Sequence, residues 1–411
     1  MKKRNDITLL IIGAGIYQMP LLEYASKHYR VVLAAPVISP EFAKLADNTV
    51  ICDVRDRDTI LDFARREHIQ GVITDQTDIP VRTVAYIAEQ LRLPGIGLDT
   101  ATLFTDKSLM RERQKALGIP ILPSLTTDSL EDALQFLEKI NASVIIKPLD
   151  NQGSRGVQTV GSKEEMKTKF AEASRYSTSG QVLVERMATG REFVVEGLVC
   201  NGEYHTLICG DTYYFDMPDA FAATMRCFPS NSDTELVSLI KQRNEEIIRG
   251  FRLKQGITHS EFIVDDGEPY LLETAARGGG VFISSDLISL STGLNTEEFL
   301  CNIALGIQTS MPHIQENLCS CGYMAFFLPD GEVVSLDGVD DVRALPYVHN
   351  NLLSELHVGM HIQNHCDKTT RYSIIVSASN REQLAEHMDN IRKMLLIKTK
   401  TNNGIKLPVW K

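Results

Sequence analysis

Short apolar runs alternate with amphipathic segments along the first hundred residues. Four runs have the length and composition of buried strands, and the three segments between or after them repeat apolar residues at helical spacing. The strand candidates are 7–12, 30–34, 50–52 and 71–74, and the helix candidates are 19–28, 56–67 and 79–91. Strands that alternate with helices predict a parallel, doubly wound α/β sheet, which here ends near Gly97.

The first strand candidate is followed by Gly13-Ala14-Gly15-Ile16-Tyr17-Gln18, which imitates a dinucleotide-binding fingerprint. Gln18 stands where that fingerprint has its third glycine, and an isolated Gly-x-Gly is a weak indication of a dinucleotide site. An NAD-dependent oxidoreductase is therefore only a remote alternative for this chain.

A hairpin with two well-placed carboxylates is predicted near residue 260. Two apolar strands flank an acidic turn at 265–269, and antiparallel pairing would bring Glu261 and Glu273 side by side. Adjacent carboxylates repel each other unless a cation balances them, and a hard ion such as Mg²⁺ shared with phosphates suits such a pair. Arg277 and the glycines 278–280 follow, offering a cation and a backbone that a ligand can approach closely. The alternative is a surface hairpin with solvated glutamates.

Two lysines upstream lie in settings that suit phosphate. Lys107 begins a predicted helix that runs to about Leu117, and Lys147 ends an apolar strand at 143–148. The loop after that strand can fold its amides into an anion-binding nest. It is not a Walker loop, because no Gly-Lys-Ser/Thr follows, and its glycines could instead be ordinary turn residues. The residues of interest in this loop are Gly153, Ser154 and Gly156.

A third segment could hold a nucleotide base. Two strands are predicted at 181–185 and 191–197, joined by a connector whose exposed backbone could pair with the edge of adenine. Glu192 could accept hydrogen bonds from ribose hydroxyls, as carboxylates do in other nucleotide folds. The alternative is a pair of amphipathic strands with outward glutamates.

In this order the motifs resemble the ATP-grasp superfamily over roughly residues 98–307. The likeness is to its carboxylate–amine ligases, above all L-amino acid ligases, and more loosely to biotin carboxylases and purine-pathway members. It implies ATP and Mg²⁺ as cofactors, with Mn²⁺ as an alternative ion. Lys107 and Lys147 would contact the ATP phosphates beneath a mobile flap formed by the glycine loop. Glu185 and the backbone near Ala188 would meet adenine, and Glu192 the ribose.

The resemblance also implies roles at the metal end of the site. Glu261 and Glu273 would hold Mg²⁺, and Arg277, together with Lys147, would stabilise the transferred phosphoryl group or an acyl phosphate. Many members carry an asparagine metal ligand two residues after the second glutamate, whereas this chain has Ala275. That departure leaves the number of metal ions open.

Three domains are expected from the resemblance and the pattern together. They are a Rossmann-like domain at 1–97, an ATP-grasp domain at 98–308 with a lid at about 118–186, and an α+β domain at 309–411. Strands at 321–328, 332–336 and 370–377 and a helix at 380–395 support the last domain, which would close one side of the active site or form a homodimer surface. His357, His361 and His365 in this domain are predicted to be surface histidines.

Composition and charge limit the kinds of binding partner and the cellular location that we expect. The 411-residue chain has a net charge of −11, which argues against nucleic acid as the main partner. No stretch approaches the apolar length of about 20 residues that spans a bilayer. The eight cysteines form no Cys-x-x-Cys motif, and without a credible signal peptide a cytoplasmic protein with reduced thiols is expected.

Substrate recognition is predicted less sharply. Arg226 lies in an aromatic, turn-rich segment at 211–229 and could pair with a substrate carboxylate, or it could be a surface arginine beside a loop. Neither His259 nor Asp286 is singled out as a base. The expected activity is an ADP-forming ligase that activates a small carboxylate, in particular that of an amino acid, as an acyl phosphate and joins it to an amine. The alternatives are phosphorylation of bicarbonate or formate, as in purine-pathway members, or a non-catalytic nucleotide- or metabolite-binding module.

Overall fold

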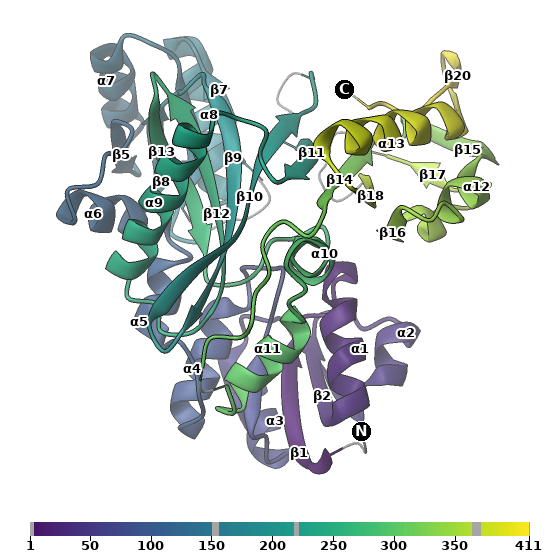
Figure 1. Cartoon of the computed structure of the whole chain (residues 1–411). Coiled ribbons are helices and arrows are strands. Elements are labelled where there is room, and N and C mark those ends of the chain that lie inside the picture. Colours follow the sequence, from purple (N-terminus) through teal and green to yellow (C-terminus); the bar gives the residue numbers. More distant parts are fainter. Residues whose placement is uncertain (1–3, 150–155, 218–221, 309, 364–370, 411) are drawn as a thin grey trace.

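The computed structural model describes residues 4–149, 156–217, 222–308, 310–363 and 371–410 (Figure 1). The chain folds into mixed α/β layers built on one parallel sheet and three sheets that are antiparallel. In this part of the chain no helix combines the length and apolar character that a bilayer crossing requires. The seven cysteines described are free thiols.

The first hundred residues form the parallel sheet that the sequence predicts. Its strand order is β3-β2-β1-β4. Alternate residues of the strands face opposite sides: Leu9 and Ile11 pack toward α1 and α11, whereas Leu10 and Ile12 pack toward α3 and α4. Burial on both faces explains why the strands are almost entirely apolar. The elements are β1 (Arg4–Ile12), α1 (Met19–His28), β2 (Tyr29–Ala35), α2 (Pro40–Leu45), β3 (Asn48–Ile51), α3 (Arg57–Arg66), β4 (Gly71–Ile73) and α4 (Val81–Leu91).

The central sheet has eight strands in the order β13-β12-β9-β10-β11-β14-β18-β16. It crosses residue 308, the expected domain boundary, because β11 pairs with β14. The strands that come after the boundary therefore continue the sheet that carries the hairpin near residue 260. The strands are β9 (Arg191–Cys200), β10 (Glu203–Tyr214), β11 (Ala223–Phe228), β12 (Gly256–Asp265), β13 (Glu268–Ala275), β14 (Ser320–Phe326), β16 (Val348–Asn351) and β18 (Tyr372–Ala378).

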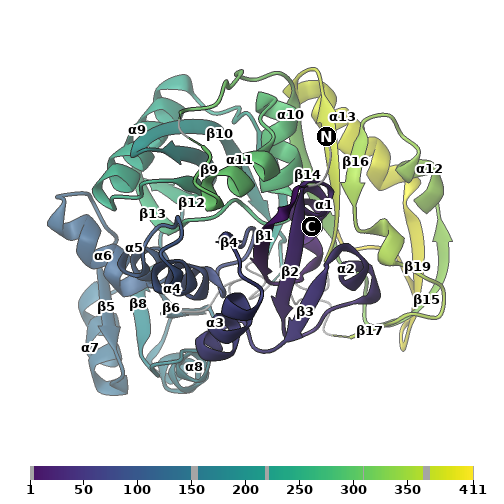
Figure 2. The same cartoon turned by 90° about the horizontal axis from the view of Figure 1, so that it is seen from below.

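A smaller four-stranded sheet, in the order β5-β8-β6-β7, has its own apolar core. Leu137 of one helix and Met166 of the next pack against Val144 and Val184 on its strands. Seen from below, this sheet lies on one side of the N-terminal domain and the C-terminal elements lie on the other (Figure 2). Its elements are β5 (Ser124–Thr127), α7 (Leu130–Ile140), β6 (Val144–Pro148), β7 (Gln158–Val160), α8 (Lys163–Arg175) and β8 (Val182–Arg186).

The remaining helices flank these sheets. The helix α6 carries Lys107 at its first position, and its N-cap Asp106 accepts hydrogen bonds from the amides of Ser108 and Leu109. Outside the C-terminal region, the helices not yet given are α5 (Leu98–Leu103), α6 (Lys107–Ala116), α9 (Thr234–Gly250), α10 (Ile288–Thr292) and α11 (Thr296–Ala304). The C-terminal region adds α12 (Val339–Arg343), α13 (Arg381–Met394) and a sheet of β15 (Gly331–Asp337), β17 (His361–Ile362), β19 (Leu396–Thr401) and β20 (Gly404–Lys406).

One prediction about this C-terminal region concerns three histidines. His357 and His361 are exposed, as expected of surface histidines, and His365 lies outside the described residues. Among the residues that can be described, no group of three or more histidine, cysteine or acidic side chains is arranged to hold a metal ion.

Candidate active site

The hairpin near residue 260 pairs in the predicted way. The strands β12 and β13 run antiparallel, and Glu261 lies directly opposite Glu273. Residues opposite each other project from the same face of a sheet, so both carboxylates border the same space. Each has a cationic partner: Arg226 donates to Glu261, and the Lys107 Nζ lies 2.9 Å from Glu273 Oε1. The alternative of a surface hairpin with solvated glutamates is therefore wrong.

A cavity of about 150 Å³ lies between this hairpin and the small four-stranded sheet. Its apolar lining includes Leu122, Ile145, Ile263 and Leu272, which suit contact with an apolar ring. The same lining brings together most of the residues predicted for the nucleotide and its metal. These are Lys107, Lys147, Glu185, Ala188, Glu192, Glu261 and Glu273.

The glycine loop is only partly described. Gly153 and Ser154 lie outside the described residues. Gly156 has a φ of +74°, and a Cβ atom there would lie 2.8 Å from the Tyr176 ring and 2.9 Å from Pro148. Both the left-handed backbone and the crowding require glycine at this position.

Glu185 is the centre of a buried ion-pair network. Its side chain is 1% exposed, with Arg111 Nε at 2.7 Å and Lys147 Nζ at 2.8 Å from its two oxygens. Burial opposes ionisation, but the two cations outweigh it and lower the pKa of Glu185 to about 2. The carboxylate expected to meet adenine is thus already paired, and it holds Lys147 against the cavity wall.

Arg111 is a site residue that the sequence analysis missed. It lies four residues after Lys107 on α6, a spacing that puts both side chains on one helix face. Besides Glu185, it reaches the Leu272 carbonyl at 2.9 Å and therefore ties the small sheet to β13. Its spacing of four residues from Lys107 was the feature of the sequence that could have predicted this role.

Glu192 faces the cavity near its junction with a second one. The Tyr214 hydroxyl donates a hydrogen bond to its carboxylate. Burial raises the pKa of Glu192, while the tyrosine hydrogen bond lowers it and nearby Glu261 raises it further. Because both Glu185 and Glu192 turn inward, the alternative of outward, solvated glutamates is also wrong.

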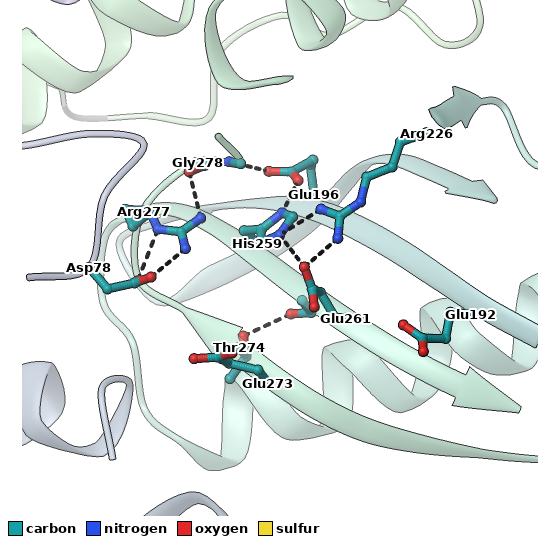
Figure 3. Close-up of polar contacts among 12 residues, drawn as sticks. Asp78, Glu192, Glu196, Arg226, His259, Glu261, Glu273, Thr274, Arg277 and Gly278 are labelled. Carbon is teal, nitrogen blue, oxygen red and sulfur yellow. Dashed lines mark hydrogen bonds and ion pairs between the residues drawn. The ribbon is translucent and has the colours of Figure 1, made fainter. Parts of the chain in front are cut away.

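Arg226 belongs to a buried charged network around Glu261 (Figure 3). It lies within β11 and is 8% exposed, so the alternative of a surface arginine beside a loop is wrong. Burial lowers its pKa, but Glu261 more than offsets this and raises it. The strand was not predicted because the segment before it is rich in turn residues.

His259 and Glu196 complete this network. They are cross-strand partners on β12 and β9, and the His259 Nδ1 is hydrogen-bonded to Glu196 (Figure 3). The other ring nitrogen lies 3.2 Å from Glu261 Oε1 and 3.1 Å from Arg226 Nη1. Burial lowers the pKa of His259, but its contacts with Glu196 and Glu261 raise that pKa overall. His259 lies two residues before Glu261 on the same strand, and this spacing could have predicted that both side chains project from one face of the sheet.

Arg277 is held by the N-terminal domain. Its Nε and Nη2 atoms bind the two oxygens of Asp78 at 2.9 and 2.5 Å, and its Nη1 donates to the Gly278 carbonyl (Figure 3). Burial lowers the pKa of Arg277, and Asp78 raises it more strongly. Asp75 accepts from the Gly278 amide at 2.9 Å. The loop after β4 therefore fixes the glycine-rich segment from a distance of 199 residues along the chain.

A second cavity, of about 540 Å³, adjoins the first. The two share Tyr214, Glu261 and Glu273, so the paired carboxylates stand at their junction. The larger cavity is lined from all three regions of the chain. Its lining includes Tyr17, Gln76 and Asp78 from the N-terminal region, Arg226, His259 and Arg277 from the centre, and Tyr323, Leu352 and Arg371 from the C-terminal region.

The Gly-x-Gly loop lines this larger cavity instead of a dinucleotide site. The Gln18 Oε1 accepts a hydrogen bond from the Gly15 amide at 3.0 Å, and its Nε2 donates to Thr74 at 3.1 Å. A Cβ atom on Gly13 would lie 2.5 Å from the Gln18 side chain. Gln18 thus covers the amide that a pyrophosphate would need.

The donor set at the junction fits a magnesium ion shared with phosphates. Mg²⁺ commonly takes one or two protein carboxylates and completes its shell with water and substrate oxygens, so it does not need a closed protein cage. Glu261 and Glu273 supply those carboxylates, and each now pairs with a cation. Ala275 is 2% exposed and offers no donor, which suits a two-carboxylate site.

Comparison with known proteins agrees with this geometry. Residues 140–286 match the family model described as the ATP-grasp domain. The chain is 26% identical over 232 residues to alanine–anticapsin ligase from Bacillus subtilis strain 168, covering 51% of this chain and 48% of that protein. The chain spans less than half the length of the first curated relatives it matches.

Two solved structures share the fold over nearly the whole chain. An L-amino acid ligase from Bacillus licheniformis superposes with a TM-score of 0.82 at 20% identity, covering 97% of this chain and 100% of that chain. The biotin carboxylase domain of Hydrogenobacter thermophilus 2-oxoglutarate carboxylase, solved with MgADP and bicarbonate, gives 0.75 at 16% identity, covering 97% and 91%. The predicted fold class is confirmed.

Proposed function

Because the chain contains an ATP-grasp domain, we propose that it is an ADP-forming ligase that activates a carboxylate with Mg²⁺-ATP and joins it to an amine. A single observation carries this proposal. The smaller cavity lined by the two lysines and the larger cavity lined by three arginines share Glu261 and Glu273 at their junction. A phosphoryl group can therefore pass from a nucleotide in one cavity to an acid in the other.

In this proposal the smaller cavity binds ATP. Adenine lies in the apolar part near Ala188, and Glu192 accepts from the ribose. Lys107 and Lys147 contact the phosphates. Of the glycine loop predicted to cover them, Gly153 and Ser154 lie outside the described residues. Mg²⁺ on Glu261 and Glu273 supplies charge neutralisation of the phosphates when it is bound.

The chemistry needs positioned charge more than a nucleophile from the protein. A carboxylate oxygen of the acid attacks the γ-phosphorus, and ADP leaves. The amine then attacks the acyl carbon, phosphate leaves, and the amine gives up a proton as the amide forms. Arg277, fixed by Asp78 and pointing into the larger cavity, stabilises the charge on the transferred group. Arg226 orients the acid, and its buried Nε has no hydrogen-bond partner among the described residues.

An amino acid is the acid that the site supports best. The larger cavity has room for two small organic substrates, and its charges are of both signs, as an amino acid requires. The fold neighbour with the TM-score of 0.82 is named an L-amino acid ligase.

The test is Mg²⁺-dependent ADP release over a matrix of amino acids and small carboxylates, each crossed with amines, including ammonia. We expect ADP only where one acid and one amine are both present. Bicarbonate and formate are included as acids, and ADP with either of them would favour the alternative. ADP with an acid alone would indicate a kinase or a leaking acyl phosphate. No ADP in any combination, despite ATP binding, would contradict the ligase proposal.

A further inference from the structure

Arg371 stands at the wall of the larger cavity and has no role in the chemistry described above. It comes directly before β18, in the C-terminal region. Its Nη1 donates to the Ala223 carbonyl at 2.7 Å, and its guanidinium carbon lies 5.6 Å from the centre of the Tyr323 ring. These contacts hold the side chain in one place.

Charge balance sets Arg371 apart from the other two arginines of the cavity. Arg226 pairs with Glu261, and Arg277 pairs with Asp78. Within the described parts of the chain, no carboxylate lies at ion-pair distance from Arg371. Its Nε is buried and makes no hydrogen bond to any described residue. An arginine that lines a cavity without a carboxylate partner can bind an anionic ligand through its guanidinium.

Two tyrosines line the cavity together with Arg371. Tyr323 adjoins both arginines, because it is the cross-strand partner of Arg226 in the β11–β14 pair and its ring lies beside the Arg371 guanidinium. Tyr17, from the N-terminal region, lines the same cavity. Arg226 is paired with Glu261 at the junction of the two cavities, whereas Arg371 has an aromatic ring as its neighbour.

We propose that Arg371 binds a substrate carboxylate that is not phosphorylated in the reaction. This inference rests on the proposed ligase function and adds a substrate class to it: one of the two substrates carries a second, unreacted carboxylate. The group can belong to the amine substrate, which would then be an amino acid, or to a dicarboxylic acid substrate. One cation beside two aromatic rings balances a single negative charge, which favours a carboxylate over a phosphate dianion.

The test compares substrates that differ only in that carboxylate. On the amine side, glycine and alanine are compared with glycinamide and alaninamide; on the acid side, glutamate is compared with glutamine. ADP release gives kcat/KM for wild type, Arg371→Gln and Arg371→Lys. The matched control is Arg343→Gln, which changes an exposed arginine of α12 in the same region.

We expect wild type to prefer the carboxylate-bearing member on one side by at least about tenfold, which corresponds to about 1.4 kcal/mol. Arg371→Gln should lose that preference while turning over the amide at a similar rate. Arg371→Lys should be intermediate, because it keeps the charge and loses the planar fork. The side that shows the preference identifies the substrate that carries the group. An equal preference in wild type and Arg371→Gln would overturn the assignment.

A binding measurement keeps this inference separate from the ligase proposal. If wild type releases no ADP with any pair, the ligase proposal fails, and calorimetric titration with glutamate and succinate decides the anion site. Binding that is lost in Arg371→Gln and kept in Arg343→Gln would support the site. Binding that is unchanged in Arg371→Gln, or absent from wild type, would overturn it. If Arg371→Gln does not fold by thermal unfolding, Arg371→Lys serves in both measurements.

Discussion

The two adjoining cavities differ in where their walls come from. Among the described residues, those that line the smaller cavity all lie between 107 and 273, within a single stretch of chain. The larger one draws on residues from Gly13 to Arg371 and needs the N-terminal loops and the C-terminal strands as well. The cavity proposed for the nucleotide thus belongs to one stretch of chain, whereas the cavity proposed for the acid and the amine also needs the regions that pack around it.

The ion pairs of the two cavities also differ in how far apart along the chain their partners lie. In the smaller cavity, Glu185 and its two cations come from elements close to this cavity. In the larger cavity, Arg277 depends on Asp78, which belongs to a different domain. Changes in the N-terminal loop should therefore alter acid and amine turnover while leaving ATP binding largely intact.

The largest expected effect is at the junction of the two cavities. Glu273→Ala should reduce ADP formation by at least about 10³-fold, because it removes one of the two proposed metal carboxylates and breaks the Lys107–Glu273 ion pair. Steady-state ADP release measures this, with circular dichroism to show that the fold survives. Glu268→Gln, on the same strand but paired with Arg243 away from the cavities, is the control. Similar activity in Glu273→Ala and the control would contradict the metal assignment.

The next effect tests the buried network of the smaller cavity. Glu185→Gln should destabilise the fold by about 3 kcal/mol, because it leaves two buried cations unpaired, and should weaken ATP binding through Lys147. Since the pKa of Glu185 is lowered to about 2, its stabilisation is fully present above the ordinary glutamate pKa and is lost as pH falls toward 2. Chemical denaturation of both proteins measures this. The stability difference should be constant from pH 6 to 8 and shrink below pH 4; a difference that grows in acid would contradict the assignment.

A smaller effect tests the dependence of the larger cavity on the N-terminal domain. Asp78→Asn should lower kcat by about 10²-fold while the KM for ATP changes little, because Arg277 loses its bidentate anchor and moves. The control is Asp62→Asn, which changes an exposed aspartate of α3 in the same domain. A rise in the KM for ATP as large as the fall in kcat would show that the N-terminal loop affects both cavities and not the larger one alone.

The smallest effect concerns recognition of the acid. Arg226→Ala should raise the KM for the acid by about tenfold or more, because a charged pair with a carboxylate is lost. The KM for the amine should change less. Kinetics with the acid and amine that the matrix identifies will measure both values. An unchanged KM for the acid would remove Arg226 from substrate binding and leave it as the partner of Glu261.

Local patterns were enough for the N-terminal sheet and for the nucleotide side of the site. Period-two and helical spacing are properties of short segments, and they identify the parallel strands and the helix that begins at Lys107. The same is true of the Glu261–Glu273 pair, because a short acidic turn sets the register of its hairpin. Arg111 was within reach of this reasoning, since it is one helical turn from Lys107.

Only the tertiary structure decided the larger cavity. Asp78 and Arg277 are 199 residues apart, and Arg226 meets Tyr323 across strands that the expected domain boundary separates. Such pairs depend on how distant regions of the chain pack together. The spacing of residues within one segment does not indicate that packing. Arg371 looks like any arginine at the start of a strand until the fold brings it to Tyr323 and Tyr17. The sequence alone therefore determined the strands of the N-terminal sheet, the lysines proposed to bind phosphate and the paired carboxylates, whereas the larger cavity forms only where three regions of the chain meet.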